Sequence, residues 1–457
     1  MPEALPDGAE AAFETGSGSE RVDRAVKAAL AQYFDVETHA AVALSGGRDS
    51  MALLHAVAAF SGARTGALSA IHIHHGLSRH ADGWADFCDA ACRARSISLT
   101  VRRVEVPRGG RTSLEAEARR VRYVALAEAA AAIGARVVLL AHHMDDQSET
   151  LLLQLLRGAG PAGLAAMPEM REDAAGLVWL RPLLGVRRMD IDAYARENGL
   201  AWIEDDSNAD GRHARNALRR SVTPELRAIA HGYPATVARS ARLQAESVLL
   251  ASDLAAIDAA ESYDGTSLDC MALAALAPHR ARNLLRWFLR ERGLPGPSAA
   301  RLDAMARQLS GTRADAQVRI AHGGAEIGVH RGRVVVHSVP PAPFEHTWHG
   351  ETSIAFGHGT LSLVSAMGAG IARRRLDVAC VTIRSRRGGE TLALARNRPR
   401  QSLKALLQRA AVPAWSRQAL PLVFCDADLA AVPGIGIDYR YRAEPGVEGV
   451  EIEWRDG

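Results

Sequence analysis

The most informative segment of this chain reads Val42-Ala43-Leu44-Ser45-Gly46-Gly47-Arg48-Asp49-Ser50. Its apolar residues predict a strand that ends at Leu44, and the apolar pattern that follows Asp49 predicts a helix. Two glycines between them allow backbone N–H groups to approach an anion, and the start of the helix directs its positive dipole end at the same place. The segment therefore predicts a phosphate-binding turn, although it lacks the lysine of the Walker loop.

Strands and helices alternate on both sides of this turn. We expect strands at Ala40–Leu44, Leu68–Ile73, Leu99–Val106 and Val137–Leu140, and helices at Arg21–Phe34, Ser50–Phe60, Ala81–Ala94 and Ser113–Gly134. Apolar strands separated by helices of this length are typical of βαβ units. The sequence therefore predicts an α/β fold with a parallel, Rossmann-like sheet that is covered on both faces.

Polar clusters follow three of the expected strands. Ser45-Gly46-Gly47 follows the first strand, His74-His75 follows the second, and the segment His142–Glu149 follows the fourth. Ligands of open parallel sheets bind at the carboxyl ends of the strands. We therefore expect the three clusters to converge on one edge of the sheet.

Two carboxylates of the third cluster are spaced to act on one ligand. Asp146 and Glu149 are three residues apart, so they share one face of the helix that is expected to begin there. Such a pair beside a phosphate-binding turn suits Mg²⁺ or a substrate ammonium group. The alternative is that these residues only cap the helix. A zinc site made from the paired histidines is disfavoured, because adjacent side chains of an extended segment point in opposite directions.

Composition narrows the choice of chemistry. The chain has 457 residues, of which 48% are hydrophobic and 23% charged, with a formal net charge of +3, as in ordinary globular proteins. Only Lys27 and Lys404 are lysines, so a mechanism that depends on a protein lysine has few candidates. The five cysteines form no C-x-x-C pair. Neither a signal peptide nor a membrane-spanning run is recognised, so we expect a cytoplasmic protein that does not enter the membrane.

Changes in composition divide the chain into three expected domains. Pro, Gly, Ser and acidic residues dominate the first twenty positions, and a Pro-rich linker follows a β-like piece at residues 316–336. We expect a disordered tail at 1–20, an ATP-binding catalytic domain at 21–225, a mostly helical domain at 226–338, a linker at 339–346 and a small α+β domain at 347–457.

Several motifs together resemble one known family. Ser45–Ser50 is similar to the pyrophosphate-binding loop (PP-loop) of the N-type ATP pyrophosphatases, which split ATP into AMP and pyrophosphate. The further motifs are His72–Leu77, Glu117–Tyr123, His142–Thr150, Leu156–Met167, Arg181–Leu184, Asp206–Asn208, Arg215, Asn216, Arg219, Ile383–Glu390, Leu403, Lys404 and Val412–Arg417. This ordered set resembles the tRNA(Ile)-lysidine synthetases from about residue 37 to the end of the chain.

The resemblance implies a ligase that modifies tRNA. ATP would activate C2 of the wobble cytidine in the CAU anticodon of isoleucine tRNA, which gives an adenylated base and pyrophosphate. The side-chain amine of free L-lysine would then displace AMP and form lysidine, which recodes the tRNA from AUG to AUA. The implied cofactors are ATP and Mg²⁺. The oligomeric state stays open, with a homodimer as one alternative.

The resemblance also implies roles for individual residues. The expected ATP-binding residues are Ser45, Gly46, Gly47, Arg48, Asp49 and Ser50. The expected catalytic residues are Asp49, Asp145, Asp146, Glu149, Arg119 and Arg215, with Asp49 and Asp145 as candidate ligands of Mg²⁺. The residues expected beside the reacting base are His74, His75, His142, Asn208 and Asn216. Asp146 and Glu149 would hold the lysine ammonium, while the two arginines would neutralise phosphate charge.

Basic residues gather in the last domain, where they are expected to bind the tRNA backbone. They are Arg373, Arg374, Arg375, Arg384, Arg386, Arg387, Arg396, Arg398, Arg400 and Lys404. By resemblance, this domain and the helical domain would recognise the tRNA body and acceptor stem. The alternative is a solvated, arginine-rich surface.

Three other functions are weighed against the lysidine ligase. A PP-loop tRNA thiolase would use C-x-x-C pairs, which are absent from this sequence. A ligase for a small substrate would not need two further domains with arginine clusters. A non-catalytic RNA-binding protein with a decayed ATP loop would not be expected to keep both the intact Ser45–Ser50 loop and the carboxylates Asp145, Asp146 and Glu149.

Overall fold

The structure is a computed structural model that describes residues 16–33, 38–61, 68–76, 78–107, 114–204, 214–310, 318–357 and 359–456. The chain divides into two compact units, Met1–Leu250 and Ala251–Gly457. Asn208 and most of the expected N-terminal tail lie outside the described residues. Helix α2 begins at Gly18, inside the stretch that was expected to be disordered.

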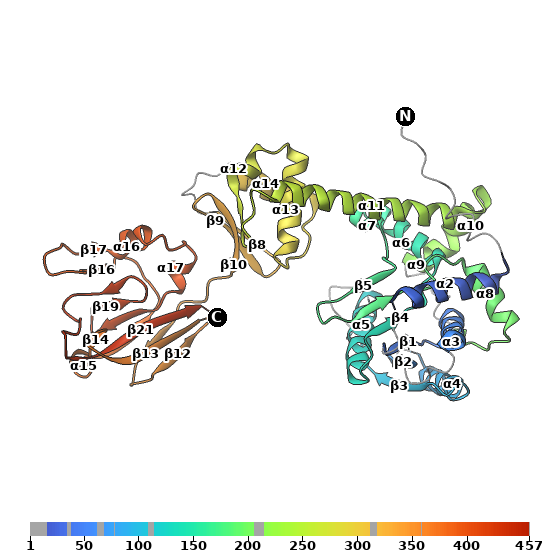
Figure 1. The fold of residues 1–457 in the computed structure, drawn as a ribbon, viewed down its shortest axis with the longest axis horizontal. Coiled ribbons are helices and arrows are strands. Elements are labelled where there is room, and N and C mark those ends of the chain that lie inside the picture. Colours follow the sequence, from blue (N-terminus) through green and yellow to red (C-terminus); the bar gives the residue numbers. More distant parts are fainter. Residues whose placement is uncertain are drawn as a thin grey trace. The chain divides into compact units, whose positions relative to one another are not determined.

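The first unit is built on a six-stranded sheet in the order β3-β2-β1-β4-β6-β5 (Figure 1). Its strands are β1 (Ala40–Ala43), β2 (Leu68–His74), β3 (Ser98–Arg103), β4 (Val137–Leu139), β5 (Met170–Glu172) and β6 (Val178–Leu180). Only β5 pairs antiparallel with its neighbour. The predicted parallel, Rossmann-like sheet is confirmed, and all four predicted strands are present with small shifts at their ends.

Helices cover both faces of this sheet. One face carries α2 (Gly18–Tyr33), α3 (Arg48–Ser61), α4 (Ala81–Arg93) and α8 (Arg188–Glu197), and the other carries α5 (Leu114–Ala132). Alternation along β1 explains the two layers: Val42 packs into the first core with Leu53 and Leu54, whereas Ala41 packs into the second with Leu126. Small and β-branched residues in β1 therefore allow a helix to approach from either side.

The strand order places a switch point between β1 and β4. From this pair the chain builds outward through β2 and β3 on one side and through β6 and β5 on the other. Helix α3 follows β1, and α6 (Met144–Leu156) follows β4, so both helices begin at the same edge of the sheet. Ligands of open α/β sheets bind at such a switch point, at the carboxyl ends of the strands.

A helical segment follows the sheet. It contains α9 (Ala214–Ala217), the π-helical turn η3 (Leu218–Val222), α10 (Thr223–Ile229) and the long helix α11 (Tyr233–Ala259), whereas α7 (Pro161–Leu164) lies earlier in the chain, between α6 and β5. The boundary that we expected at residues 225 and 226 falls within α10, whereas the two compact units divide inside α11. Helical periodicity marks a buried face but does not reveal the element that covers it. None of the described helices combines the length and apolar character of a membrane span.

The second unit begins with the expected helical domain, which also contains a sheet. Helices α12 (Cys270–Ala275), α13 (Pro278–Glu291) and α14 (Ala299–Ser310) pack with the antiparallel strands β7 (Ser267–Asp269), β8 (Arg319–His322), β9 (Ala325–His330) and β10 (Arg333–Ser338). Leu284, Phe288, Leu302 and Val334 form part of their shared core.

The last domain is rich in β-structure. One sheet contains β11 (Glu345–Thr347), β15 (Val381–Arg384), β18 (Leu422–Cys425), β19 (Asp428–Val432) and β20 (Gly436–Ile437). A second contains β12 (Ser353–Phe356), β13 (Gly359–Met367), β21 (Glu448–Asp456) and β14 (Ile371–Ala372), and a third contains β16 (Thr391–Leu392) and β17 (Gln401–Ser402). Short helices α15 (Arg373–Leu376), α16 (Leu403–Arg409) and α17 (Ser416–Ala419) lie between the strands.

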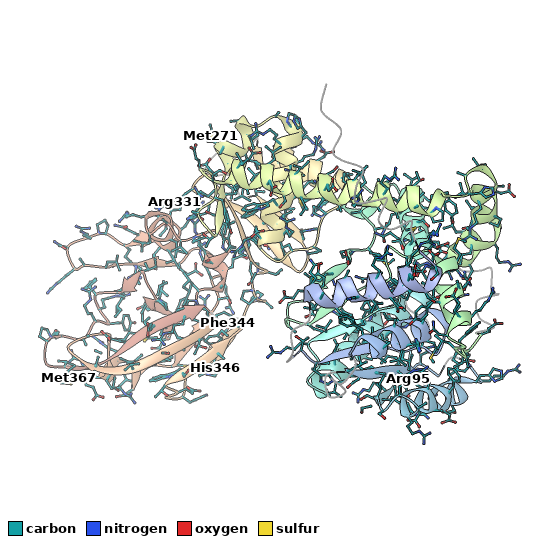
Figure 2. All side chains as sticks on the ribbon, turned by 45° about the vertical axis from the view of Figure 1, so that its right-hand side comes forward. Arg95, Met271, Arg331, Phe344, His346 and Met367 are labelled. Carbon is teal, nitrogen blue, oxygen red and sulfur yellow. The ribbon has the colours of Figure 1, made fainter. Side chains whose placement is uncertain are left out.

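The expected linker ends earlier than predicted. Phe344, which is labelled in Figure 2, stacks on Phe356 with ring centroids 4.2 Å apart. Strand β11 then begins at Glu345. The end of the predicted linker at 339–346 is therefore part of the folded domain, because an aromatic residue anchors it to the sheet.

Candidate active site

The glycine turn after β1 is closed by its own hydroxyl groups. The Ser50 hydroxyl donates to the Gly47 carbonyl at 2.8 Å and lies 3.1 Å from the Ser45 hydroxyl, which accepts a hydrogen bond from the Gly47 N–H at 3.3 Å. Gly46 has a φ of 84°, a conformation that side chains disfavour. The N–H of Ile203 donates to the Gly46 carbonyl at 2.9 Å, so a later segment holds the turn from outside.

Buried polar groups support the turn from below. His72 on β2 places Nδ1 2.9 Å from the Leu44 carbonyl, and Cys88 Sγ lies 3.6 Å from the same nitrogen. Burial lowers the pKa of His72 and raises the pKa of Cys88 to about 12, so a neutral imidazole donates to the end of β1. Cys88 is fully buried, as expected for a cysteine that packs as a small hydrophobic residue.

Arg48 and Asp49 connect the turn to neighbouring helices. The Arg48 guanidinium forms ion pairs with Asp192 on α8 and with Asp49, the latter at 3.1 Å. Burial alone would raise the pKa of Asp49, but His143 and Arg48 outweigh it and hold that pKa below its ordinary value. Asp49 is therefore an anion at the first turn of α3.

His143 joins the glycine turn to the carboxylate pair. Its Nε2 lies 3.6 Å from Asp49 Oδ2 and 3.5 Å from Asp146 Oδ2. The His143 N–H donates to the Asp146 carboxylate at 3.1 Å, which caps the start of α6. Asp146 therefore performs the capping role that we considered as an alternative, and it also lies beside the phosphate-binding turn. The expected convergence of these two clusters on one edge of the sheet is confirmed.

Asp146 and Glu149 face the same pair of arginines. Arg219 on η3 contacts Glu149 at 2.6 Å and Asp146 at 3.0 Å, and Arg215 on α9 contacts Glu149 at 3.0 Å. Burial opposes ionisation of Asp146, but positive charge on His143, Arg215 and Arg219 lowers its pKa. Arg219 entered the sequence analysis only as part of a motif, although its position four residues after Arg215 indicates a shared helical face.

Asp145 points toward other partners. Its carboxylate accepts a hydrogen bond from the Arg188 N–H at 2.9 Å and pairs with Arg227 at 2.7 Å. It thereby anchors the start of α8 and the helix α10 to α6. The assignment of Asp145 to catalysis and to Mg²⁺ stays a prediction, and the geometry favours Asp146 and Glu149 as the carboxylates that face a ligand.

His142 follows β4 at this edge of the sheet and is partly buried. Among the described residues, its Nδ1 has no hydrogen-bond partner. Burial lowers the pKa of His142 to about 3, and the charges of Arg181, Arg119 and Arg215 act in the same direction while Asp146 opposes them. A neutral imidazole with an unused nitrogen therefore lies among three arginines.

The remaining candidates are more dispersed. His74 Nε2 lies 3.2 Å from Asp82 and 3.3 Å from Arg103, and Arg119 stacks over the Tyr123 ring at 5.2 Å from its centroid. His75 follows β2 and Asn216 lies on α9 beside Arg215. The roles of His74, His75 and Asn216 beside the base, and the role of Arg119 in catalysis, stay predictions.

The donor set offers limited support for a metal ion. Among the described residues, no three His, Cys, Asp or Glu side chains come together as metal ligands. Asp145 is held by Arg227 and the Arg188 backbone, which leaves Asp49 as the carboxylate at the glycine turn. The residues present therefore fit a cation that is bound mainly by the phosphates of a nucleotide.

The basic residues of the last domain fall into two groups. Internal acids hold some of them: Arg384 and Arg386 lie near Glu390, Arg387 pairs with Glu345, Arg373 with Asp377, and Arg400 with Asp438. Others have exposed side chains, namely Arg374, Arg375, Arg396, Arg398 and Lys404. The exposed group is the one whose charge is directly available to a partner.

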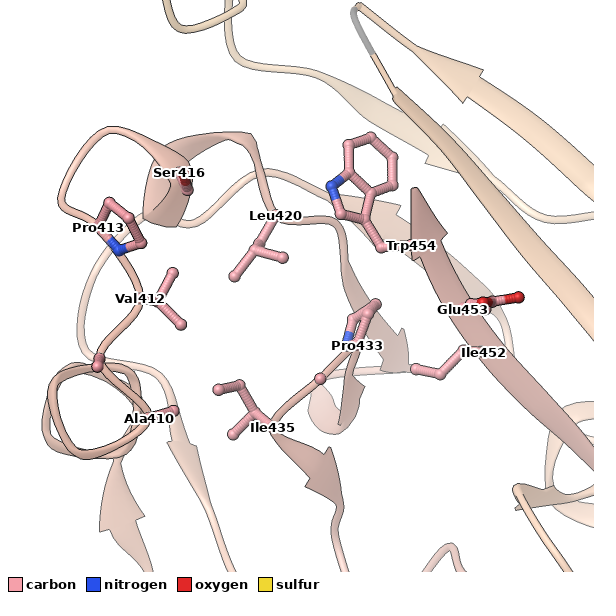
Figure 3. Close-up of a pocket in the computed structure, with 12 residues that line it drawn as sticks. Ala410, Val412, Pro413, Ser416, Leu420, Pro433, Ile435, Ile452, Glu453 and Trp454 are labelled. Atoms are coloured by element: carbon pink, nitrogen blue, oxygen red, sulfur yellow. The ribbon is translucent and has the colours of Figure 1, made fainter. Parts of the chain in front are cut away.

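A hollow of about 510 Å³ also lies in the last domain (Figure 3). Val412 and Pro413 form one wall and Trp454 of β21 forms another. The run Val412–Arg417, which contributes to the resemblance, therefore borders a mostly apolar hollow of the last domain.

Comparison with known proteins covers most of the chain. The PP-loop domain matches residues 19–226, the TilS substrate binding domain matches 268–335, and the TilS substrate C-terminal domain matches 381–454. A tRNA(Ile)-lysidine synthase of Nitrosomonas europaea is 40% identical over 420 residues, which cover 90% of this chain and 91% of that protein. One of Ralstonia nicotianae is 42% identical, with coverage of 87% and 89%. A solved U34-tRNA thiolase of Methanococcus maripaludis is 15% identical over 50% of this chain and 80% of that chain, and its TM-score of 0.44 is too low to bear on function.

Proposed function

The chain belongs to the tRNA(Ile)-lysidine synthases, and we propose that it uses ATP to join free L-lysine to C2 of the wobble cytidine in the CAU anticodon of isoleucine tRNA. One observation carries this proposal: the glycine turn and the carboxylate pair lie at one edge of the sheet, with His143 within 3.6 Å of Asp49 and 3.5 Å of Asp146. The proposed phosphate site and the proposed ammonium site would thus be adjacent, as an ATP-driven amine ligation requires.

The first step activates the base. The C2 carbonyl oxygen attacks the α-phosphorus of ATP, the new O–P bond forms, and pyrophosphate leaves. Ser45, Gly46, Gly47 and Ser50 would hold the leaving pyrophosphate through hydroxyl groups, backbone N–H groups and the start of α3. Asp49 would help to hold a Mg²⁺ ion that the phosphates bring, and such an ion would supply charge neutralisation for the phosphates.

The second step transfers lysine. The side-chain amine attacks C2, the C–O bond to the adenylate breaks, and AMP leaves while the amine loses protons. Asp146 and Glu149 would position the ammonium group and accept a proton, because only the neutral amine is a nucleophile. His142 is neutral and its Nδ1 has no hydrogen-bond partner among the described residues. Because the charge of Asp146 acts on its ring, His142 would lie near the proposed ammonium site.

The thiolase alternative finds little support. Four cysteines are buried and Cys380 alone is exposed. The burial of Cys88, Cys92, Cys270 and Cys425 raises the pKa of each thiol, which disfavours the thiolate that sulfur transfer needs. The matched families and relatives are likewise lysidine synthases.

A single assay tests the proposal. The protein is incubated with ATP, radiolabelled L-lysine and isoleucine tRNA that carries a CAU anticodon, and label in the tRNA is measured. We expect incorporation that requires ATP and is absent with a tRNA of another anticodon. The proposal would be contradicted if pyrophosphate were released but no lysine entered the tRNA, however high the lysine concentration.

A further inference from the structure

The site assigned to the lysine ammonium already contains two cations of the same chain. Glu149 receives Arg219 Nε on one oxygen at 2.6 Å and Arg215 Nε on the other at 3.0 Å. One oxygen of Asp146 accepts a hydrogen bond from Arg219 Nη2 at 3.0 Å, and the other accepts one from the backbone N–H of His143 at 3.1 Å. Each carboxylate oxygen therefore has a partner before any substrate is present.

These contacts would oppose a third cation. Two carboxylates balance two guanidinium groups, so an incoming ammonium would meet like charge within a few ångströms and would have to share oxygens that already accept hydrogen bonds from cationic side chains or the backbone. The carboxylates are buried, with exposed side-chain fractions of 12% for Asp146 and 5% for Glu149. Screening by water is weak at such a site, and the repulsion is correspondingly strong.

The two arginines reach the carboxylates from a more accessible position. Their exposed side-chain fractions are 21% for Arg215 and 31% for Arg219. Arg215 also contacts the Thr150 hydroxyl at 3.0 Å, whereas Arg219 lies on the π-helical turn Leu218–Val222. Such turns are rare and occur often at functional sites, where a local change in winding moves the side chains.

A competing anion is expected next to them. Burial opposes the charge of Arg219, but Glu149, Asp146 and, last, Asp49 in the first turn of α3 raise the pKa of Arg219. Phosphates at the glycine turn and the phosphate backbone of the tRNA would present several negative charges to the same guanidinium groups. Arginine binds phosphate oxygens in the same forked geometry that it uses for carboxylates.

We infer that Arg215 and Arg219 are exchangeable counter-ions, which occupy the ammonium site of the free enzyme and move to phosphate oxygens when nucleotide and tRNA bind. The inference rests on the proposed function. Lysine is then admitted after ATP, so the nucleophile arrives when an activated base is present. The same contact would make the empty site a poor binder of free amines.

Direct binding of L-lysine tests the exchange. Calorimetric titration is carried out on the protein alone, with a non-hydrolysable ATP analogue, and with the analogue plus CAU-anticodon tRNA. We expect lysine affinity to rise by about tenfold with the ligands, a coupling typical of interacting sites. Equal affinity in all three states would overturn the inference.

A matched pair of variants locates the effect. Arg219→Gln removes the competing charge and should raise the lysine affinity of the free protein by about tenfold, with a smaller further gain from nucleotide. Arg93→Gln removes a guanidinium that pairs with Asp89 on the surface of α4 and should bind lysine like the parent protein. Unchanged or weaker lysine binding by Arg219→Gln would overturn the exchange. If that variant does not fold, Arg215→Gln carries the same expectation.

The inference and the proposed function fail in different ways. Lysine incorporation into tRNA, combined with lysine binding that is indifferent to nucleotide, would overturn the exchange and leave the ligase activity in place. Absence of both lysine binding and incorporation under every condition would overturn the two together.

Discussion

Asp145 and Asp146 are adjacent in the chain but have different partners. Asp146 shares Arg219 with Glu149 and lies beside His143, whereas Asp145 holds Arg227 and the Arg188 N–H. The carboxylate of Asp146 is therefore the one proposed to face a ligand. The carboxylate of Asp145 connects α6 to α8 and α10. Replacement of each carboxylate by an amide should therefore have a different consequence.

Asp146→Asn should reduce lysine incorporation by at least two orders of magnitude, because an amide neither balances an ammonium charge nor accepts its proton. Binding of the tRNA should stay near the parent value. Asp145→Asn should instead lower the free energy of unfolding by about 1–2 kcal/mol, a value that allows for the half-exposed Arg227. Radiolabel incorporation and denaturant titration measure the two effects, and equal losses of activity would remove the distinction.

Gly46 and Gly47 form a second pair of neighbours that should respond differently. An added Cβ at Gly46 would lie 2.6 Å from Ile203 Cδ1 and 3.2 Å from Cys88 Sγ, at a φ of 84°. An added Cβ at Gly47 would meet only Ser45 Oγ at 3.5 Å, an ordinary contact. Gly46→Ala should therefore cost about 1–3 kcal/mol of stability and weaken ATP binding. Gly47→Ala should unfold like the parent protein, and a melting curve shifted as far as that of Gly46→Ala would count against this account.

Among the elements, the junction after β20 depends on one fully buried carboxylate. Asp438 pairs with Arg400 at 3.0 Å and with Arg440 at 3.1 Å, and it accepts the Ala393 N–H at 3.2 Å. Burial opposes its ionisation, but the hydrogen bonds and the charge of Arg440 lower the pKa of Asp438. The carboxylate thus connects β16, β17 and β20 through two arginines and a backbone group.

The sign of the pH dependence follows from that lowered pKa. A carboxyl group whose pKa is lower in the folded than in the unfolded state stabilises the fold above its ordinary pKa of about 4, and this contribution is lost as the pH falls through the folded pKa. Asp438→Asn should cost about 2 kcal/mol at pH 7 and progressively less below pH 4. Denaturant titrations from pH 7 to pH 3 measure the difference, and a constant difference across that range would exclude the ionised pair as its source.

For the whole molecule, tRNA binding should depend most on basic residues that lack an internal acid. Arg396 and Arg398 are exposed in the segment between β16 and β17, whereas Arg386 and Arg387 are held by Glu390 and Glu345. Simultaneous Arg396→Gln and Arg398→Gln substitutions should weaken tRNA binding and reduce the slope of log affinity against log salt by about 1–2. Arg455→Gln, which removes a guanidinium paired with Glu453, is the control. An unchanged salt slope in the double variant would place the tRNA elsewhere.

Local sequence patterns were sufficient to predict the order of strands and helices in the first unit. Alternating apolar strands and helices indicated the order of elements, and the glycine turn together with the Asp146/Glu149 spacing indicated the two halves of the site. These features depend on neighbours in the chain, because backbone conformation and helical spacing are local properties. The position of the unit boundary inside α11 and the sheet of the helical domain were less readable, because they depend on which distant surface buries an apolar face.

The amino-acid order established the strand–turn–helix, the parallel sheet and the convergence of two polar clusters, since each follows from short-range geometry and the rule that parallel strands end at one edge. The partners of the charged groups came from the folded chain alone. Glu149 and Arg219 are separated by 70 residues along the chain, and Asp145 and Arg227 by 82. No local pattern encodes such pairs, because their members come together only when the chain folds. A charge that packing removes from water is strongly destabilising unless an opposite charge lies next to it.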